Sequence, residues 1–109
     1  MIIDVRSKNL DLSPDERAHA ERSLRTALDR FAPRIAQVRV SIADVNGPKG
    51  GIDKTCRVQV HGRSGWEVLV SQADAEVFAL IDRASQRAGQ AVARLLDRAR
   101  EESTRGARA

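Results

Sequence analysis

The sequence has few of the residues on which disulfide, metal and membrane-spanning structures depend. Among 109 residues there is one cysteine, Cys56, and there are two histidines, His19 and His61, with no ligand-like spacing around them. An internal disulfide and a cysteine-rich zinc site are therefore excluded. No window approaches the roughly 20 apolar residues of a membrane-spanning helix, and the first residues do not form a secretion signal. We expect a soluble, cytoplasmic protein that binds neither metal nor cofactor.

A glycine-rich segment, residues 45–55, raises the question of a nucleotide site. In a phosphate-binding loop a lysine and a serine or threonine follow a glycine directly and lead into a helix. Here Lys54 and Thr55 follow Asp53, and residues 56–61 alternate apolar and polar side chains, as a strand does. The segment therefore predicts a connection between two antiparallel strands and not a phosphate-binding loop.

The first helix is predicted from its capping residues. Ser13 is a typical N-cap, Pro14 suits the first helical position, and Glu16 completes a capping box with the serine. Apolar residues then recur at spacings of three and four, and Pro33 predicts an end at about Ala32.

The remaining pattern predicts four strands and a long second helix. Alternating apolar residues indicate strands at about 2–6, 35–45, 55–61 and 66–70, and residues from 74 or 75 to about 100 keep a helical period without proline. Each helix has one apolar stripe and the sheet has one apolar face. We therefore predict an α+β, β-α-β-β-β-α two-layer sandwich, a four-stranded antiparallel sheet with both helices on one face.

The chain length supports one domain around one core, which would bury about 65% of the surface of the unfolded chain. We predict that residues 1–101 form a single α+β domain and that residues 102–109 form a flexible basic tail.

No catalytic constellation emerges from the sequence. The serines lie at helix caps, turns and helix surfaces, and neither histidine has a carboxylate at a fixed spacing to orient it. Most acidic residues lie within three or four positions of an arginine on a helix, which surface ion pairing explains. The sequence therefore predicts a protein that is not an enzyme.

Positive charge is concentrated on the second helix. The chain has 19 Lys and Arg against 15 Asp and Glu, a net charge of +4. At 100° per residue, four arginines fall within about 60° of arc over a length of about 22 Å: Arg83, Arg87, Arg94 and Arg98. Opposite charge occurs in this row only at its ends, at Glu76 and Glu101. The row suits a nucleic-acid backbone, although a solvated helix face whose arginine stems cover the core edge would give the same pattern.

The outward-facing strand positions also gather charge. They include Arg6, Arg39, Arg57, His61 and Glu67. On a sheet with one buried face, such a row is typical of a surface exposed to solvent, and we assign it no function from the sequence.

Three segments, taken with the order of elements, resemble the ribosome hibernation promoting factor family, also called ribosome-associated translation inhibitors. They are residues 8–14 (KNLDLSP), 44–54 (DVNGPKGGIDK) and 75–84 (AEVFALIDRA). The resemblance extends over roughly residues 1–100. It implies a fold akin to double-stranded-RNA-binding domains. It also implies binding to the small ribosomal subunit during starvation or stationary phase, in the channel that messenger and transfer RNA would occupy.

The resemblance also implies which residues meet ribosomal RNA. Basic residues of the second helix do so in the family, and the matching positions here are Arg87 and Arg94. The helical geometry adds Arg83 and Arg98 to the same row.

On the first helix, Arg22 and Arg25 are further candidates for RNA contact. The chain departs from the family at Phe78, where tyrosine is common. It also departs at Gly89 and Gln90, where well-known members place basic or charged residues.

We therefore expect a factor that binds ribosomal RNA, inhibits translation and is monomeric when free. The alternative is a protein-interaction module of the same fold, with Phe78, Leu96 and Ala99 as its contact surface. The sequence does not decide whether residues 46–53 contact RNA.

Overall fold

The computed structural model describes residues 1–45 and 53–107, with side chains described up to residue 100. The elements follow in the order β1 (Ile2–Lys8), α1 (Pro14–Leu28), a 3₁₀ helix η1 (Asp29–Arg34), β2 (Ile35–Asp44), β3 (Lys54–Gly62), β4 (Glu67–Asp74) and α2 (Val77–Ala107). Most of the glycine-rich segment, residues 46–52, lies outside the described residues.

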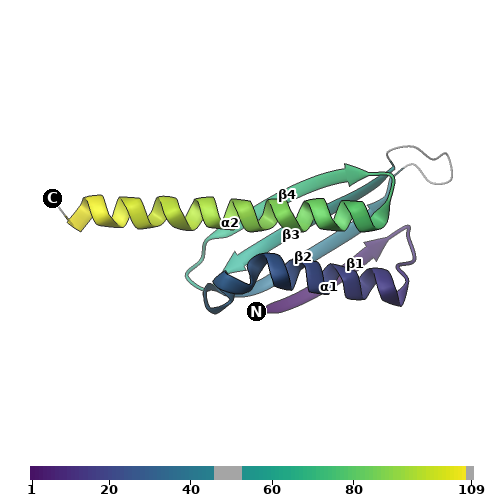
Figure 1. Cartoon of the computed structure of the whole chain (residues 1–109), viewed down its shortest axis with the longest axis horizontal. Coiled ribbons are helices and arrows are strands. Elements are labelled where there is room, and N and C mark those ends of the chain that lie inside the picture. Colours follow the sequence, from purple (N-terminus) through teal and green to yellow (C-terminus); the bar gives the residue numbers. More distant parts are fainter. Residues whose placement is uncertain (46–52, 108–109) are drawn as a thin grey trace.

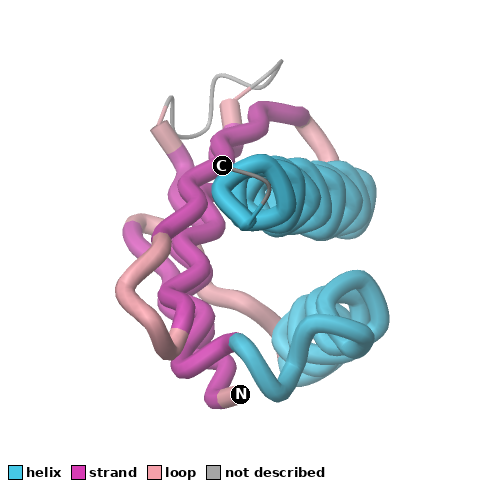
Figure 2. Tube along the Cα trace, turned by 90° about the vertical axis from the view of Figure 1, so that its left-hand side faces the viewer, coloured by secondary structure: helices cyan, strands magenta, loops and turns pink. Residues whose placement is uncertain are grey.

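The four strands form one sheet in the order β1-β2-β3-β4, and both helices cover the same face of it (Figures 1 and 2). This confirms the predicted two-layer α+β fold. The expectation of a wholly antiparallel sheet is wrong, because β1 pairs with β2 in parallel while the other pairs are antiparallel. The reason is topological: α1 lies between β1 and β2 and returns the chain to its starting end, so β2 runs in the direction of β1.

The start of α1 is fixed by the predicted capping box. The Ser13 hydroxyl accepts a hydrogen bond from the backbone N–H of Glu16 at 3.1 Å, and the Ser13 N–H donates to Glu16 Oε1 at 2.8 Å. The end of α1 was predicted too late, because the α-helix stops at Leu28 and η1 follows. A proline at position 33 has no N–H for an α-helical bond and its ring clashes with the carbonyl four residues earlier, so the chain tightens into the 3₁₀ form.

The core lies between the inner face of the sheet and the two helices. Alternate strand residues supply one side of it, and the apolar stripes of α1 and α2 supply the other. Its largest fully buried side chains are Leu24, Leu28, Ile35, Ile42, Leu80, Ile81, Val38, Val40, Val58, Val60, Val92 and Cys56. The strand alternation predicted the strand members of this set.

The apolar flank proposed as an alternative contact surface does not exist as such. Leu96 is only 6% exposed and belongs to the core. Phe78 is 39% exposed, and its ring meets the ring of His19 edge-on, with the ring centroids 5.1 Å apart. Of the three residues, only Ala99 is neither buried in the core nor packed against an aromatic ring. No contiguous apolar patch therefore remains on this flank.

The two helices approach each other closely at Gly89. A Cβ atom added there would lie 2.9 Å from the backbone oxygen of Ala27, a contact that real Cβ atoms essentially never show. The close approach of the helices gives a packing reason for a glycine at position 89.

Helix α2 continues to Ala107, beyond the predicted end at about residue 100. Its C-terminal part projects past the end of the sheet, as its length suggests (Figure 1). The boundary between domain and tail proposed from the sequence stays a prediction.

The contact at Gly89 gives a first prediction. Replacing Gly89→Ala should lower the free energy of unfolding by about 1–2 kcal/mol, because overpacking costs about 1–3 kcal/mol and the better helix propensity of alanine returns up to about 1. Urea unfolding followed by circular dichroism measures this. The matched control is Gln90→Ala at the exposed next position, which we expect to change stability by about 0.5 kcal/mol or less. Equal or higher stability of Gly89→Ala would contradict the close approach of the helices.

The single cysteine gives a second prediction. Cys56 is 1% exposed, and burial raises the pKa of its thiol from 9.0 to about 12. The folded state therefore holds the thiol proton more tightly than the unfolded state does. The contribution of the buried thiol to the free energy of unfolding is complete below pH 9 and is lost as the pH rises from 9 towards 12.

The free energy of unfolding should fall in that range by up to about 1.4 kcal/mol per pH unit relative to Cys56→Val, which has no thiol. Urea unfolding at several pH values measures the difference between the two proteins. Below pH 9, a thiol reagent should modify the folded protein only as fast as it unfolds. Rapid modification of the native protein, or identical pH profiles for the two proteins, would show that Cys56 is accessible.

Candidate nucleic-acid interface

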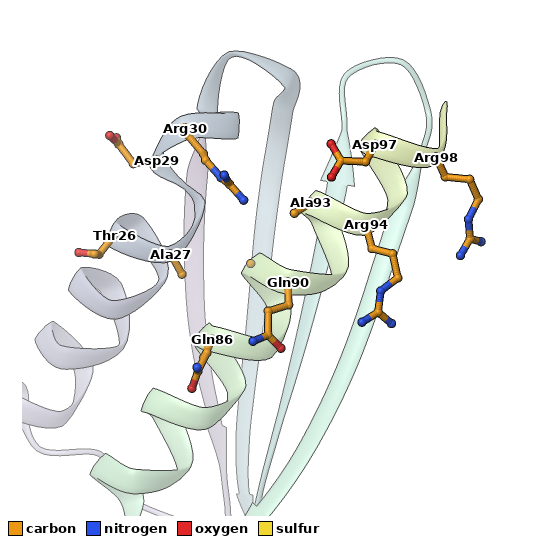
Figure 3. A pocket seen from close by; sticks show the side chains of 11 residues that line it. Thr26, Ala27, Asp29, Arg30, Gln86, Gln90, Ala93, Arg94, Asp97 and Arg98 are labelled. Carbon is orange, nitrogen blue, oxygen red and sulfur yellow. The ribbon is translucent and has the colours of Figure 1, made fainter. Parts of the chain in front are cut away.

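The four arginines of the predicted row all lie exposed on α2. The stripe that α2 buries against the sheet fixes the rotation of the helix about its axis, and the row falls on the flank next to β4. Arg94 and Arg98 extend from the same side of the helix, whereas Asp97 extends from the other side (Figure 3). The geometric part of the prediction, one row along one flank, thus agrees with the structure.

The first two arginines of the row are held by β4. Arg83 Nη1 lies 3.4 Å from Asp74 Oδ2, in an ion pair whose arginine side chain is 65% exposed. With the Gln72 amide oriented so that its oxygen faces the guanidinium, this oxygen accepts a hydrogen bond from Arg87 Nε at 3.2 Å and a second from Nη1. Gln72 is neutral, so the charge of Arg87 is kept. Asp74 offsets part of the charge of Arg83.

From the sequence, Glu76 and Glu101 at the ends of the row were the only acids expected to oppose its charge. This expectation is wrong in two respects. Asp74 was missed because it belongs to β4. Glu76 is engaged elsewhere, since its two carboxylate oxygens accept hydrogen bonds from the N–H groups of Phe78 at 3.1 Å and Ala79 at 2.8 Å, which caps the start of α2. The side chain of Glu101 lies outside the described part of the chain.

The last two arginines of the row have no such partner. Within residues 1–45 and 53–100, no carboxylate lies within ion-pair distance of Arg94 or Arg98. Both side chains are exposed to solvent. These two residues are the strongest part of the candidate interface.

Arg94 and Arg98 border a groove of about 890 Å³ between α2 and the end of α1. Figure 3 shows Gln86, Gln90 and Ala93 on the α2 side, with Arg30 extending from the end of α1 towards α2. Small residues leave the groove open, and the carboxylates of Asp29 and Asp97 also line it.

Arg30 was not found from the sequence. It follows the end of α1, where no helical spacing relates it to other arginines. Its guanidinium lies 4.5 Å from the ring centroid of Phe31, a cation–π contact that holds the side chain in place.

Arg22 and Arg25 lie exposed on α1 and do not join the row on α2. They border a shallow depression of about 360 Å³ together with Thr26 and Asp29. Thr26 also lines the groove between the helices, so the depression and the groove adjoin. The arginines of the two helices thus share one broad helical face, although they are separate groups on it.

A serine, a histidine and an aspartate do meet across the helices, at a site the sequence did not predict. Asp82 Oδ1 lies 2.6 Å from His19 Nε2, and the Ser23 hydroxyl lies 3.4 Å from the same ring nitrogen. In a catalytic triad the serine and the acid bind opposite nitrogens of the imidazole, so that the acid orients the ring while the other nitrogen takes the serine proton. Here both bind Nε2, and the cluster is a polar tie between α1 and α2.

Neither a metal site nor a membrane-spanning helix occurs within the described residues. Within them, no group of three or more His, Cys, Asp and Glu residues could hold a metal ion. No helix in the same part of the chain is long and apolar enough to span a membrane.

Known proteins are similar to this chain over most of its length. The family model described as sigma 54 modulation protein / S30EA ribosomal protein matches residues 3–100. Among curated protein sequences no match is found.

Two solved structures are similar along most of the chain. The crystal structure of the N-terminal domain of Protein Y from Thermus thermophilus has 29% sequence identity and a TM-score of 0.71, and the match covers 87% of this chain and 99% of that one. A ribosomal subunit interface protein from Coxiella burnetii has 15% identity and a TM-score of 0.73, covering 89% and 99%, and at this identity it supports the fold alone. The family match, extending from β1 into α2, shows that the chain belongs to the sigma 54 modulation protein / S30EA ribosomal protein family.

Proposed function

We propose that the chain binds small-subunit ribosomal RNA through the arginine row of α2, lies in the channel for messenger and transfer RNA, and holds ribosomes inactive during starvation or stationary phase. The observation that carries the proposal is the row itself, four exposed arginines along one flank. Arg94 and Arg98 have no carboxylate partner within the described residues. Membership of a ribosomal protein family supports the choice of partner.

The chemistry of the row suits RNA phosphates. A guanidinium group binds a phosphate through two parallel hydrogen bonds and keeps its charge at any physiological pH. The row is about 22 Å long, enough to meet several consecutive phosphates of a backbone. Arg22 and Arg25, on the adjoining part of the helical face, would extend the contact to a neighbouring RNA segment.

The alternative, a protein-interaction module, loses its principal support. It required an apolar contact surface on α2, and Leu96 is buried in the core. The polar and cationic helical face offers little of the desolvated apolar centre that protein interfaces use.

A charge-reversal variant tests the proposal. Arg87→Glu with Arg94→Glu should lower the affinity for purified small ribosomal subunits at least about tenfold, because two phosphate contacts become repulsive. Co-sedimentation through a sucrose gradient measures this, and circular dichroism verifies that the variant is folded.

The matched control reverses two exposed arginines elsewhere. Arg34 and Arg63 lie near the β3–β4 turn, and the backbone N–H of Arg63 donates to the Arg34 oxygen at 3.0 Å. Arg34→Glu with Arg63→Glu changes the net charge equally and should bind within about threefold of the parent. Equal binding by the α2 variant and the parent would show that the row is not the interface.

The salt dependence of binding counts the phosphates. If all four arginines of the row each neutralise one phosphate, log affinity should fall with log salt concentration at a slope of about −3 to −4. The neutral variant Arg87→Gln with Arg94→Gln should reduce this slope by about two units. Affinities measured between low and physiological salt provide both slopes, and an unchanged slope in the neutral variant would contradict direct phosphate contact.

A further inference from the structure

The face of the sheet opposite the helices carries a second cationic site. The strand registers place its outward residues in cross-strand rows. One row contains Arg6, Ser41 and Arg57, on β1, β2 and β3 respectively. In the next row Arg39 lies on β2 and faces Gln59 on β3. Three arginines from three adjacent strands therefore surround the short Ser41 side chain.

These residues enclose a hollow of about 240 Å³. Its lining is Arg6, Arg39, Ser41, Arg57, Gln59 and Leu69. Ser41 lies in the middle of its row, between the longer side chains of Arg6 and Arg57. The side chains that line the hollow thus carry three positive charges and no negative charge.

Neighbouring acids cancel part of this charge, since Asp4 on β1 lies opposite Arg39 in the strand register and pairs with Arg6. Asp4 Oδ2 accepts a hydrogen bond from Arg6 Nε at 2.9 Å, which leaves the terminal nitrogens of Arg6 for another acceptor. Glu67, on β4, is bound by Gln59, which lines the hollow, and by His61 at 3.8 Å. Within the described residues, no carboxylate lies within ion-pair distance of Arg39 or Arg57. The cluster therefore differs from an ordinary solvent-exposed sheet face, on which each charged side chain is paired with an opposite charge.

The lining favours a phosphate group over a base or a protein. Sheets that read single-stranded bases stack them on aromatic side chains, and none of the lining residues is aromatic. Protein partners anchor in a desolvated apolar centre, and the lining offers only Leu69, which is 52% exposed. The guanidinium groups of the arginines, the hydroxyl of Ser41 and the amide of Gln59 are hydrogen-bond donors suited to phosphate oxygens.

The geometry points to a second RNA contact on the open face of the sheet, in which Arg6, Arg39 and Arg57 bind a backbone phosphate over Ser41. This inference rests on the proposed function, because RNA on both sides of the protein is expected only where the chain lies within a channel of RNA. The sheet site and the α2 row face opposite directions, since both helices cover the other face (Figure 2). The protein would then be held between two RNA segments.

The test compares three charge-matched variants on purified small ribosomal subunits. The sheet variant is Arg39→Glu with Arg57→Glu, the helix variant is Arg87→Glu with Arg94→Glu, and the control is Arg34→Glu with Arg63→Glu. We expect the sheet variant to lose at least about tenfold in affinity and the control to stay within about threefold. The neutral sheet variant, Arg39→Gln with Arg57→Gln, should reduce the salt slope by about two units. Binding of the sheet variant equal to that of the control overturns the inference.

The outcomes separate this inference from the proposed function. Loss of binding in the sheet variant alone supports the sheet site and rules out the α2 row as an RNA contact. Loss in the helix variant alone supports the α2 row and rules out the sheet site. Loss in both, with additive free energies in the combined variant, supports two independent RNA contacts.

A second measurement identifies the ligand class. The amide resonances of Ser41 and Arg57 are followed by NMR during titration with an oligoribonucleotide, with inorganic phosphate and with an oligoglutamate of equal charge. We expect the oligoribonucleotide to shift them at the lowest concentration. Stronger shifts with oligoglutamate would indicate an acidic protein partner and overturn the RNA assignment. Saturation by inorganic phosphate at concentrations below those of the oligoribonucleotide would indicate a free anion and also overturn it.

Discussion

The burial of one stripe of α2 against the sheet is the constraint on which the rest of the structure depends. Leu80, Ile81, Ala84, Ala88 and Val92 are each 2% exposed or less. Turning the helix would bring this stripe into water, at a cost of about 25 cal/mol for each Å² of apolar surface exposed. The rotation of α2 is therefore fixed, and with it the direction in which its arginines extend.

The position of α2 across the sheet is set by its contact with α1. The close approach at Gly89 and the polar tie between His19 and Asp82 hold the two helices in a defined relation. As a result Arg83 and Arg87 lie beside β4, and Arg94 and Arg98 border the groove towards the end of α1. A side chain at position 89 would press against the backbone oxygen of Ala27. The same packing leaves the other face of the sheet open, where the strand registers bring three arginines together.

Local patterns of the sequence predicted the order of elements, the capped start of α1, the inner rows of the strands and the arginine row. Each of these depends on helical or strand periodicity, which the sequence carries directly. The family resemblance is confirmed by the match over residues 3–100, and family membership agrees with the prediction that the chain is not an enzyme. Neither finding tests the individual RNA-binding residues.

The errors share one cause, which is that they concern contacts between elements. Alternation is the same in parallel and antiparallel strands, so the direction of β1 follows from the α1 crossover and not from the strand pattern. Leu96 lies at the edge of the helical stripe, where only tertiary packing decides its burial. Asp74 and Gln72 reach the arginine row from β4, and Arg30 reaches the groove from beyond α1. A helical projection of α2 alone contains none of these neighbours.

The claim that the helical face meets RNA is tested most directly by tethered hydroxyl-radical cleavage on small ribosomal subunits. In a Cys56→Val background, Gln90→Cys places an iron probe beside the row, and Ser64→Cys places one on the β3–β4 turn as the reference position. Our account predicts that the probe at position 90 cleaves ribosomal RNA lining the channel, more strongly than the probe at position 64. Cleavage from position 64 without cleavage from position 90 would contradict it.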